Sequence, residues 1–471
     1  MNMHLHNDLS GLKEPFEPQK PGQITFYTCG PTVYDFFHIG NARPFIVFDV
    51  LRRYFESKGL EVVFIQNFTD IDDKMIQKAE LFDVPVRDLA EKFIAAYYED
   101  ADALGIKRAT FNPRATEEIT SIIKMIERLI ERGHAYTAGG DVYFEVETFP
   151  QYGKLSKQSL DDLRSGARVD VDERKRQPLD FALWKAQKTG EPAWDSPWGP
   201  GRPGWHIECS AMAHHHLGDT IDIHGGGSDL MFPHHENEIA QSEAASGKPF
   251  ARFWIHNGYL MIDQEKMSKS LGNFFTVREV LEKYPAMAVR LFMLSAHYRS
   301  PINFSQDTLS QANNALARLR NGWAEIAFAL ETRPCDVVPC ETDGELRKAV
   351  KDARALFDEC MQDDFNTAGA IGAVFDLIHA TNVSLGRTGG IDYDTVEDAA
   401  NFLRTVDGIM GIIGAADTGK SGDDARIKAL IAERDKARKN KDFARSDEIR
   451  KALAEQGIIL EDTPQGTRLK M

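Results

Sequence analysis

The chain has 471 residues, with 56 Lys and Arg against 72 Asp and Glu, and its formal net charge is −16. A field this negative repels nucleic acid in general, so any RNA partner must dock on local basic patches. The five cysteines are too few, and odd in number, for a disulfide scaffold. The N-terminus lacks a secretory pattern and no long apolar run stands out. We therefore expect an acidic cytoplasmic enzyme of about three or four domains that does not cross a membrane.

The first elements along the chain predict a parallel sheet. Residues 23–29 read as a strand, residues 41–58 as a helix with a periodic apolar face, and residues 61–68 as a second strand. Strand, helix and strand in so short a stretch predict a right-handed βαβ unit. Ligands of such sheets bind beyond the carboxyl ends of the strands, where Cys29 and His38 fall. The expected fold class is α/β, with a Rossmann-like, doubly wound parallel sheet as the catalytic domain.

The later segments differ in texture. Residues 116–202 combine an Ile- and Glu-rich helix, a short strand pair and a Trp-, Pro- and Gly-rich stretch, which indicates an insertion into the sheet. Apolar residues at helical spacing after residue 305 predict a helical bundle. Between residues 426 and 451, ten Lys or Arg stand against five Asp or Glu, which indicates a final basic helical unit. We expect the catalytic domain in two halves, residues 1–115 and 203–305, separated by an insertion at residues 116–202. A helical bundle (306–415) and a basic unit with its linker (416–471) follow.

Two short segments suit nucleotide chemistry. In HIGN (residues 38–41), Gly40 lets a phosphate or base approach the backbone, the following helix offers free N–H groups, and His38 can donate to charge developing on phosphorus. In KMSKS (residues 266–270), Lys266 and Lys269 suit a triphosphate that becomes pyrophosphate. Each segment alone also fits an ordinary turn or a solvated loop. Together they resemble the paired signatures of class I aminoacyl-tRNA synthetases, although Asn41 stands where that family commonly has His.

A third segment, HGGGSD (residues 224–229), follows an apolar strand. It predicts a flexible loop that a ligand can approach closely. We assign Gly226 and Asp229 to contacts with an adenylate, and a simple tight turn fits the same residues equally well.

Half of the histidines lie close together. Seven of the fourteen fall between residues 206 and 235. Residues 214–216 are consecutive histidines, which point in different directions on a helix, so we interpret them as a polar surface. The pair His234 and Glu238 differs, because a spacing of four residues puts both on one helical face.

With Cys29 and Cys209, the pair His234 and Glu238 completes a plausible zinc set of two thiolates, an imidazole and a carboxylate. Their spacing matches no short metal motif. Further segments resemble the cysteinyl-tRNA synthetases over nearly the whole chain, namely CGPTVYD (29–35), NFTDIDDK (67–74), GWHIECS (204–210), FPHHENE (232–238) and DTPQGT (462–467). The resemblance implies one zinc ion on Cys29, Cys209, His234 and Glu238 and a nucleotide lysine at Lys269. It also implies that the basic unit is a small C-terminal tRNA-binding domain, and that tRNA(Cys), L-cysteine and ATP with Mg²⁺ are the partners.

A zinc ion in the amino-acid pocket could select the substrate. Cysteine differs from serine mainly by sulfur for oxygen, and zinc binds a thiolate far better than an alcohol. Four protein ligands normally close a zinc site, so the substrate thiolate must add as a fifth ligand or displace one, and Glu238 is the ligand we expect to yield. Thr32, Thr69 and Trp205 are candidates for the pocket walls, and Trp205 fits a core position equally well. The carboxylates of residues 70, 72 and 73 are structural in the family, so we assign no metal there.

The resemblance implies a two-step reaction. The carboxylate of cysteine attacks the α-phosphorus of ATP while His38, Lys266 and Lys269 stabilise the developing charge, and tRNA then takes the cysteinyl group. We expect a monomer. Three alternatives stay open: a ligase joining cysteine to an amino sugar in mycothiol synthesis, a zinc hydrolase, and a tRNA-binding paralogue without activity. The hydrolase would need a second His four residues after His235, where Ile239 stands.

Overall fold

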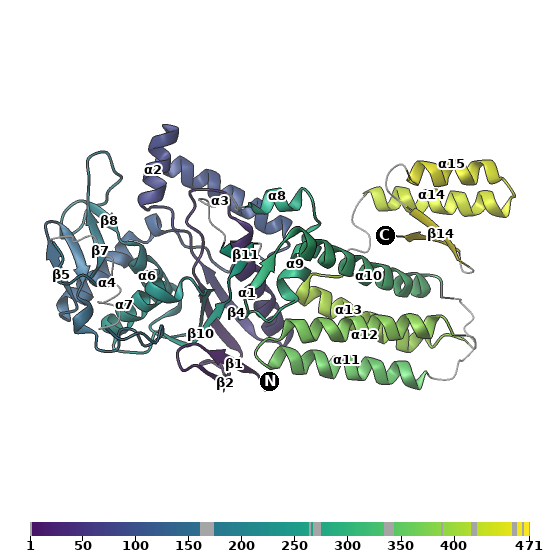
Figure 1. The fold of residues 1–471 in the computed structure, drawn as a ribbon, viewed down its shortest axis with the longest axis horizontal. Helices are drawn as coiled ribbons and strands as arrows, with labels where there is room; N and C mark the ends of the chain where they lie inside the picture. The colour runs from purple at the N-terminus through teal and green to yellow at the C-terminus, as the bar shows by residue number, and fades with distance from the viewer. Residues whose placement is uncertain are drawn as a thin grey trace. The chain divides into compact units, whose positions relative to one another are not determined.

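The computed structural model describes residues 2–160, 174–262, 265–266, 275–333, 343–387, 390–415, 422–454, 459–463 and 466–470. The chain divides into two compact units (Figure 1). The first unit comprises Met1–Lys283, His297–Phe304 and Gln362–Phe365. The second comprises Tyr284–Ala296, Ser305–Met361 and Asn366–Met471.

A four-stranded parallel sheet forms the centre of the first unit, in the order β10-β9-β3-β4. Its strands are β3 (Gln23–Thr28), β4 (Glu61–Gln66), β9 (Ile221–Gly227) and β10 (Ala251–Asn257). Helix α1 (Ile39–Ser57) connects β3 to β4, and the chain later returns to the other side of β3. The strand order therefore reverses between β3 and β9, and such a switch point is where α/β sheets bind ligands.

Helices cover both faces of this sheet. Phe26 and Tyr27 are neighbours in β3, so their side chains point to opposite faces. Phe26 contacts Phe48 of α1 edge-on, with ring centroids 5.5 Å apart. Tyr27 belongs to a buried apolar core shared with α4 (Ile119–Glu131), α6 (Trp205–Leu217) and α7 (Glu236–Ser246). The α/β, doubly wound class expected from the sequence is thus confirmed.

The insertion contains its own sheet. Four antiparallel strands, rather than the strand pair expected, run in the order β5 (Ala135–Ala138), β6 (Asp141–Phe144), β7 (Phe181–Ala186) and β8 (Gly201–Pro203). The last two strands come from the Trp- and Gly-rich stretch, whose alternation is too short to stand out in the sequence. An N-terminal hairpin of β1 (His4–Asn7) and β2 (Leu12–Pro15) attaches to β10 through Asp8, whose N–H donates to the Trp254 carbonyl at 2.9 Å.

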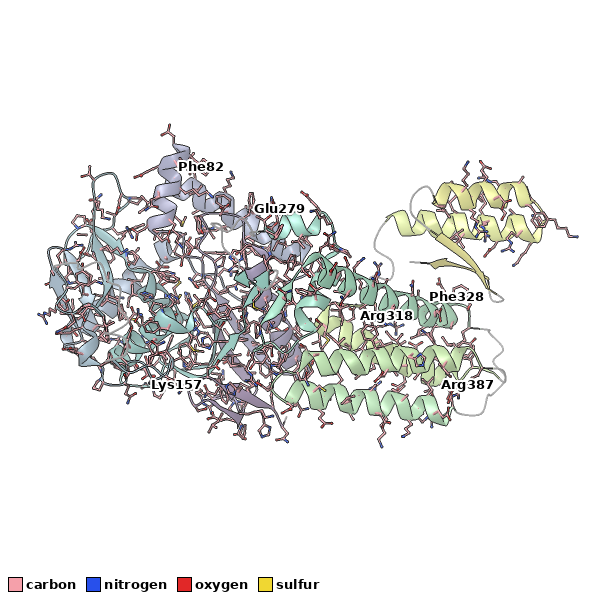
Figure 2. The ribbon with its side chains drawn as sticks, viewed as in Figure 1. Phe82, Lys157, Glu279, Arg318, Phe328 and Arg387 are labelled. Carbon is pink, nitrogen blue, oxygen red and sulfur yellow. The ribbon has the colours of Figure 1, made fainter. Side chains whose placement is uncertain are left out.

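The first unit contains further helices and short strands outside these sheets and the hairpin. Figure 2 shows Phe82, half exposed, projecting at the end of α2. These elements are α2 (Asp73–Phe82), α3 (Val86–Ala103), η1 (Ala115–Glu117), η2 (Val146–Thr148), η3 (Met231–His235), β11 (Leu260–Ile262), β12 (Glu265–Lys266), α8 (Val277–Leu281) and β13 (Ile302–Phe304).

The second unit is mainly helical. Leu316, Leu319, Trp323 and Ile326 are buried along α10, so the predicted helical spacing marks a packed face. The helices of the bundle are α9 (Ala286–Leu294), α10 (Gln306–Glu331), α11 (Gly344–Gln362), α12 (Thr367–Leu385) and α13 (Tyr393–Met410). The C-terminal elements are α14 (Gly422–Lys439), α15 (Phe443–Ala454), β14 (Ile459–Thr463) and β15 (Gly466–Lys470).

Among the described residues, α12 alone is long and apolar enough to cross a membrane by length and composition. Its apolar positions, such as Ile371, Val374 and Leu377, are buried within the unit. The composition of α12 is thus that of a core helix of the bundle.

Candidate functional site

Cys29 sits at the carboxyl edge of the sheet because two chain segments cross tightly there. It directly follows β3. The next residue, Gly30, donates its N–H to Asn67 Oδ1 at 2.9 Å, and a Cβ on Gly30 would collide with the Asn67 carbonyl. Asn67 follows β4, so the ends of β3 and β4 are pinned together and fix the position of Cys29.

The other three candidate ligands come from two helical segments on one face of the sheet. Cys209 lies in α6, His234 in η3 and Glu238 in α7, and all three are almost completely buried. Their ligand atoms and the Cys29 thiol lie within 4.8 Å of one another. The two Sγ atoms are 3.7 Å apart, and Glu238 Oε1 is 3.3 Å from Cys29 Sγ and 3.0 Å from His234 Nε2.

These separations suit a tetrahedral zinc ion. Zinc bonds of ~2.0–2.3 Å to N, O and S set neighbouring ligand atoms ~3.3–3.8 Å apart. The observed distances, including 3.6 Å between Cys209 Sγ and His234 Nε2, are within a few tenths of an ångström of that range. The donor set of two thiols, an imidazole and a carboxylate therefore fits zinc in both chemistry and spacing.

The electrostatics of the cluster agree with a cation site. Burial would raise the pKa of Glu238, but the charges and hydrogen bonds of His224 and His234 hold it well below its ordinary value. The hydrogen bond from Cys29 lowers the pKa of the Cys209 thiol against the effect of burial. Burial raises the pKa of the Cys29 thiol, as does its hydrogen bond with Cys209. Anionic oxygen and a readily ionised sulfur thus face the same buried point.

Further histidines surround the four ligands. His224 Nε2 lies 2.9 Å from Glu238 Oε2, and His235 Nε2 lies 3.3 Å from Cys29 Sγ. Cys29, His224, His235 and Glu238 form a second set whose ligand atoms converge within the same distance. We favour the set with Cys209, because it holds two sulfur ligands and leaves His224 to orient Glu238 from outside.

Sequence reasoning missed the place of His224 and His235 beside the ligands. His235 is adjacent in sequence to His234, and His224 ends an apolar strand that leads to the sheet edge, so both signals were present. Neither is a spacing rule, however, because His224 lies on β9 and Glu238 on α7, and the two meet only in the tertiary fold.

A cavity of about 370 Å³ adjoins the cluster. Eight of the predicted site residues line it, namely Cys29, Thr32, His38, Gly40, Asn41, Trp205, Gly226 and Asp229. Thr69 lies behind this wall, buried, where it forms a parallel bridge to Thr32 and donates from Oγ1 to Glu208 at 2.8 Å. The cavity thus brings together residues up to two hundred positions apart at the switch point of the sheet.

Trp205 belongs to the wall and not to the core. Its side chain is 41% exposed, which excludes the core alternative. The indole stacks on the ring of His234, with centroids 4.2 Å apart and planes inclined by 27°. It therefore joins the cavity wall to the ligand cluster.

The HIGN segment forms the start of α1. The helix begins at Ile39, two residues before the expected start, with His38 as its N-cap. The Nδ1 atom of His38 accepts a hydrogen bond from the Asn41 N–H at 3.3 Å. This cap explains why the helix begins earlier than expected. The first N–H groups of a helix lack carbonyl acceptors within the helix, and the imidazole of His38 accepts from one of them.

The sequence predicted a flexible loop for the HGGGSD segment, and this prediction is wrong. Strand β9 continues through Gly227. Gly225 and Gly226 pair with β10 in a regular parallel register. A Cβ on Gly226 would lie 2.6 Å from Cε1 of His235, and one on Gly225 would lie 2.8 Å from the Phe48 ring. These glycines let side chains from both faces rest directly on the strand.

The two lysines of KMSKS are placed only in part. The backbone of Lys266 lies in β12, opposite Met261 of β11. Lys269, within residues 267–274, lies outside the described residues.

The three carboxylates after Thr69 all have partners within the protein. Asp70 accepts from the backbone and the hydroxyl of Thr116, and Asp72 caps α2. Asp73 pairs with Lys185 and Arg202. No metal site is therefore needed to explain them.

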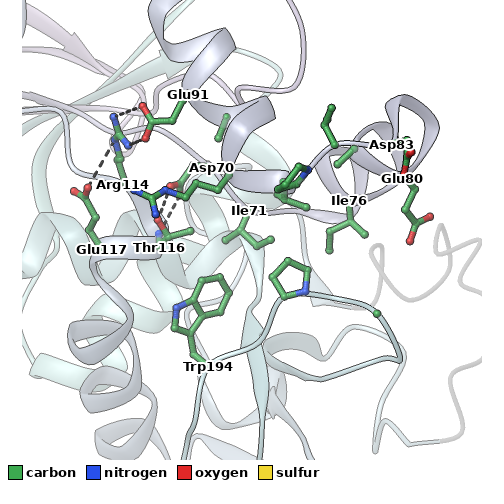
Figure 3. Close-up of a pocket in the computed structure, with 18 residues that line it drawn as sticks. Asp70, Ile71, Ile76, Glu80, Asp83, Glu91, Arg114, Thr116, Glu117 and Trp194 are labelled. Atoms are coloured by element: carbon green, nitrogen blue, oxygen red, sulfur yellow. Dashed lines mark hydrogen bonds and ion pairs between the residues drawn. The ribbon is translucent and has the colours of Figure 1, made fainter.

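A larger cavity of about 850 Å³ lies beside α2 and α3. Figure 3 shows Ile71, Ile76 and Trp194 along it, with Arg114 engaged by Glu91. None of the predicted site residues whose side chains the structure describes lines this cavity.

Comparisons with known proteins agree on one group. The chain matches the family model described as the tRNA synthetases class I (C) catalytic domain over residues 15–314, the DALR domain over residues 356–414, and the cysteinyl-tRNA ligase anticodon binding domain over residues 421–468. It is 54% identical over 468 residues to the cysteine–tRNA ligase of Caldicellulosiruptor saccharolyticus, with 99% of both chains covered. It is 53% identical over 471 residues to that of Symbiobacterium thermophilum, again with 99% of both chains covered.

Solved structures share the fold at low sequence identity. Mycobacterium tuberculosis methionyl-tRNA synthetase in complex with methionyl-adenylate is similar with a TM-score of 0.66 and 16% identity, over 84% of this chain and 92% of that one. LeuRS of Agrobacterium radiobacter, in a ternary complex, is similar with a TM-score of 0.63 and 12% identity, over 86% of each chain.

Proposed function

The chain belongs to the cysteine–tRNA ligases among the class I aminoacyl-tRNA synthetases, and we propose that its Cys29, Cys209, His234 and Glu238 cluster selects the substrate by binding zinc. Its activity is therefore the ligation of cysteine to tRNA with the use of ATP.

One observation carries the zinc proposal: Cys29 belongs both to the ligand cluster and to the cavity wall. A thiol held in the cavity can therefore reach the point on which the four ligands converge. Zinc bound there supplies a Lewis acid that stabilises a thiolate and binds an alcohol poorly. The cavity of about 370 Å³ is near the lower end of the ~300–1,000 Å³ of small-molecule sites.

The pocket walls position the substrate around that point. Trp205 stacks on His234 and closes one side of the cavity. Thr32 lines it, and the bridge to the buried Thr69 holds Thr32 in place. Glu238 is the ligand we expect to yield to the substrate, because His224 already binds its second oxygen and can retain the carboxylate.

The nucleotide is proposed to lie between the start of α1 and the end of β9. His38, Gly40 and Asn41 line one side of the cavity, where the N–H groups and dipole of α1 favour a phosphate. Gly226 and Asp229 line the other side. The carboxylate of cysteine attacks the α-phosphorus of ATP carrying Mg²⁺.

The charge that develops on the phosphates needs cationic partners. His38 can donate to the α-phosphate from the start of α1. Lys266 and Lys269 are proposed to neutralise the leaving pyrophosphate, since such catalysis consists mainly of positioning and charge compensation.

The C-terminal unit is proposed to bind the anticodon of tRNA(Cys). Its support is the match to the anticodon binding domain over residues 421–468 and the basic last turn of α14, with Lys436, Arg438 and Lys439. This unit also speaks against the mycothiol-type ligase, which has no anticodon to recognise. The five-part domain division, the monomeric state and the cytoplasmic location remain predictions.

Replacement of Cys209 by Ser tests the proposed zinc role. The variant is expected to lose zinc, measured by elemental analysis, together with the ATP–pyrophosphate exchange that depends on cysteine. Cys360→Ser is the matched control, because Cys360 is a buried cysteine of α11 outside the site. Full exchange activity in a zinc-free Cys209→Ser protein would contradict the proposal, whereas the family assignment would stand.

A further inference from the structure

A second group of potential metal ligands lies at the opposite end of α6 from its N-terminal residue Trp205. His215 and His216 are in the last turn of α6, and Glu118 immediately precedes α4. His215 Nδ1 lies 2.7 Å from Glu118 Oε2, and His216 Nε2 lies 2.8 Å from Glu118 Oε1. The three ligand atoms lie within 4.8 Å of one another.

The convergence of two consecutive histidines is unexpected from helical geometry. Neighbouring residues are ~100° apart around a helix, and for this reason the sequence suggested only a polar surface. The two rings converge because His215 presents its near nitrogen, Nδ1, and His216 its far nitrogen, Nε2, to the two oxygens of one carboxylate. The ring of Phe111 supports His216, with centroids 4.6 Å apart.

The surroundings favour a cation at this place. The negative end of the α6 dipole lies at the same turn, where positive charge is stabilised. The side chain of His215 is 54% exposed, so an ion can enter from solvent and keep water in its remaining positions.

We propose that Glu118, His215 and His216 bind a divalent transition-metal ion at a site separate from the cysteine cluster. Two imidazoles and a carboxylate suit Zn²⁺, Ni²⁺ or Co²⁺ and disfavour Mg²⁺ and Ca²⁺, which prefer oxygen ligands. The ion links α4 of the inserted region to α6, which carries Cys209 of the catalytic cluster. The proposal does not depend on the zinc role of the cysteine cluster.

The test uses the full-length protein without an affinity tag and Ni²⁺ alone as the probe. After removal of loosely bound ions, equilibrium dialysis is expected to show one tightly bound equivalent of Ni²⁺ beyond any metal held by the cysteine cluster. The double variant His215→Ala and His216→Ala is expected to lose that equivalent. His214→Ala is the matched control, because His214 pairs instead with Asp219 at 2.9 Å and should leave binding unchanged.

A spectroscopic measurement separates the two sites. Co²⁺ bound to imidazole and carboxylate lacks the thiolate-to-metal charge-transfer absorption that the cysteine cluster would give. The added equivalent of Co²⁺ should therefore contribute no such band, and added Ni²⁺ should raise the thermal midpoint of the wild type but not of the double variant. Absence of an added equivalent in the wild type, its retention in the double variant, or its equal loss in His214→Ala would each overturn the proposal.

Discussion

Asp8 holds His256 by two hydrogen bonds, one from the backbone N–H at 3.0 Å and one from the ring Nδ1 at 2.8 Å. The other ring nitrogen of His256 lies 2.8 Å from Nδ1 of His235. His235 in turn contacts Cys29 Sγ. A carboxylate at the end of the N-terminal hairpin is thus linked through two imidazoles to the proposed metal centre.

Replacement of Asp8 by Asn should weaken zinc binding. The carboxylate can only accept, so it fixes the proton of His256 on Nδ1, whereas an amide can also donate and removes that constraint. Outer partners of metal sites change affinity by ~10–100-fold, and we expect the lower end of this range because Asp8 acts through two rings. Chelator competition measures the effect. Asp363→Asn, which breaks the exposed pair with Lys13 of the same hairpin, is the control and should leave affinity unchanged.

Gly226→Ala should sharply reduce adenylate formation. The new methyl group would lie 2.6 Å from the His235 ring and would enter the wall of the cavity. Cysteine-dependent pyrophosphate exchange should fall by at least about a hundredfold, since misplacement of ~1 Å can cost that much. Gly372→Ala on α12 meets no atom within 4 Å and should retain full exchange. Normal exchange in Gly226→Ala would argue against a nucleotide site at the end of β9.

Trp205→Ala should raise the KM for cysteine. The indole stacks on His234, and such aromatic contacts contribute ~0.5–1.5 kcal/mol, which corresponds to a ~2–13-fold change. Trp205→Phe keeps the stacking face and should retain most of the affinity. Exchange kinetics at varied cysteine concentration distinguish the two variants. An unchanged KM in Trp205→Ala would show that Trp205 does not contribute to cysteine binding.

Deletion of residues 420–471 should impair tRNA charging but spare exchange. The described cavity and ligand residues all lie before residue 261, far from the deletion in sequence. Charging should show a raised KM for tRNA, measured by aminoacylation, while the KM values for ATP and cysteine stay the same. An equal fall in pyrophosphate exchange would show that the C-terminal unit supports the catalytic one.

Asp73 should make the stability of the protein depend on acidity below about pH 4. Burial raises its pKa, but hydrogen bonds and charges from Lys185 and Arg202 outweigh it and lower the pKa to about 2. A depressed pKa adds stability above the unfolded value of ~3.9, and this stability is lost as the pH falls toward about 2. Because the carboxylate is half exposed, Asp73→Asn should cost about 1 kcal/mol or less near neutrality. Urea unfolding at several pH values should show the difference from wild type shrinking in acid.

The local pattern of the sequence predicted the elements that depend on short spacing. Strand β3, helix α1 and strand β4 follow the expected order, and His234 and Glu238 do share a helical face four residues apart. Residue type made Cys29 and Cys209 plausible partners of this pair, but the assignment came from family resemblance, because no spacing rule joins residues 180 positions apart.

Features that depend on tertiary packing escaped prediction. The glycines of β9 were interpreted as a loop. The structure shows instead that a side chain at Gly226 would collide with the ring of His235, which comes from another segment and rests on the strand. His215 and His216 read as diverging for a similar reason: their common partner, Glu118, lies about a hundred positions earlier in the chain. The contribution of Asp8 depends on the docking of a hairpin onto β10, which its own sequence does not specify.

The double placement of Cys29, in the cavity wall and among the candidate ligands, couples two properties that proteins usually vary separately. If the cluster binds zinc as proposed, a substitution there alters metal retention and substrate choice at once. The rate of translation at cysteine codons, and not its accuracy, then depends on the supply of a trace element. A cell starved of zinc would lose charged tRNA(Cys) rather than accumulate proteins with serine in place of cysteine.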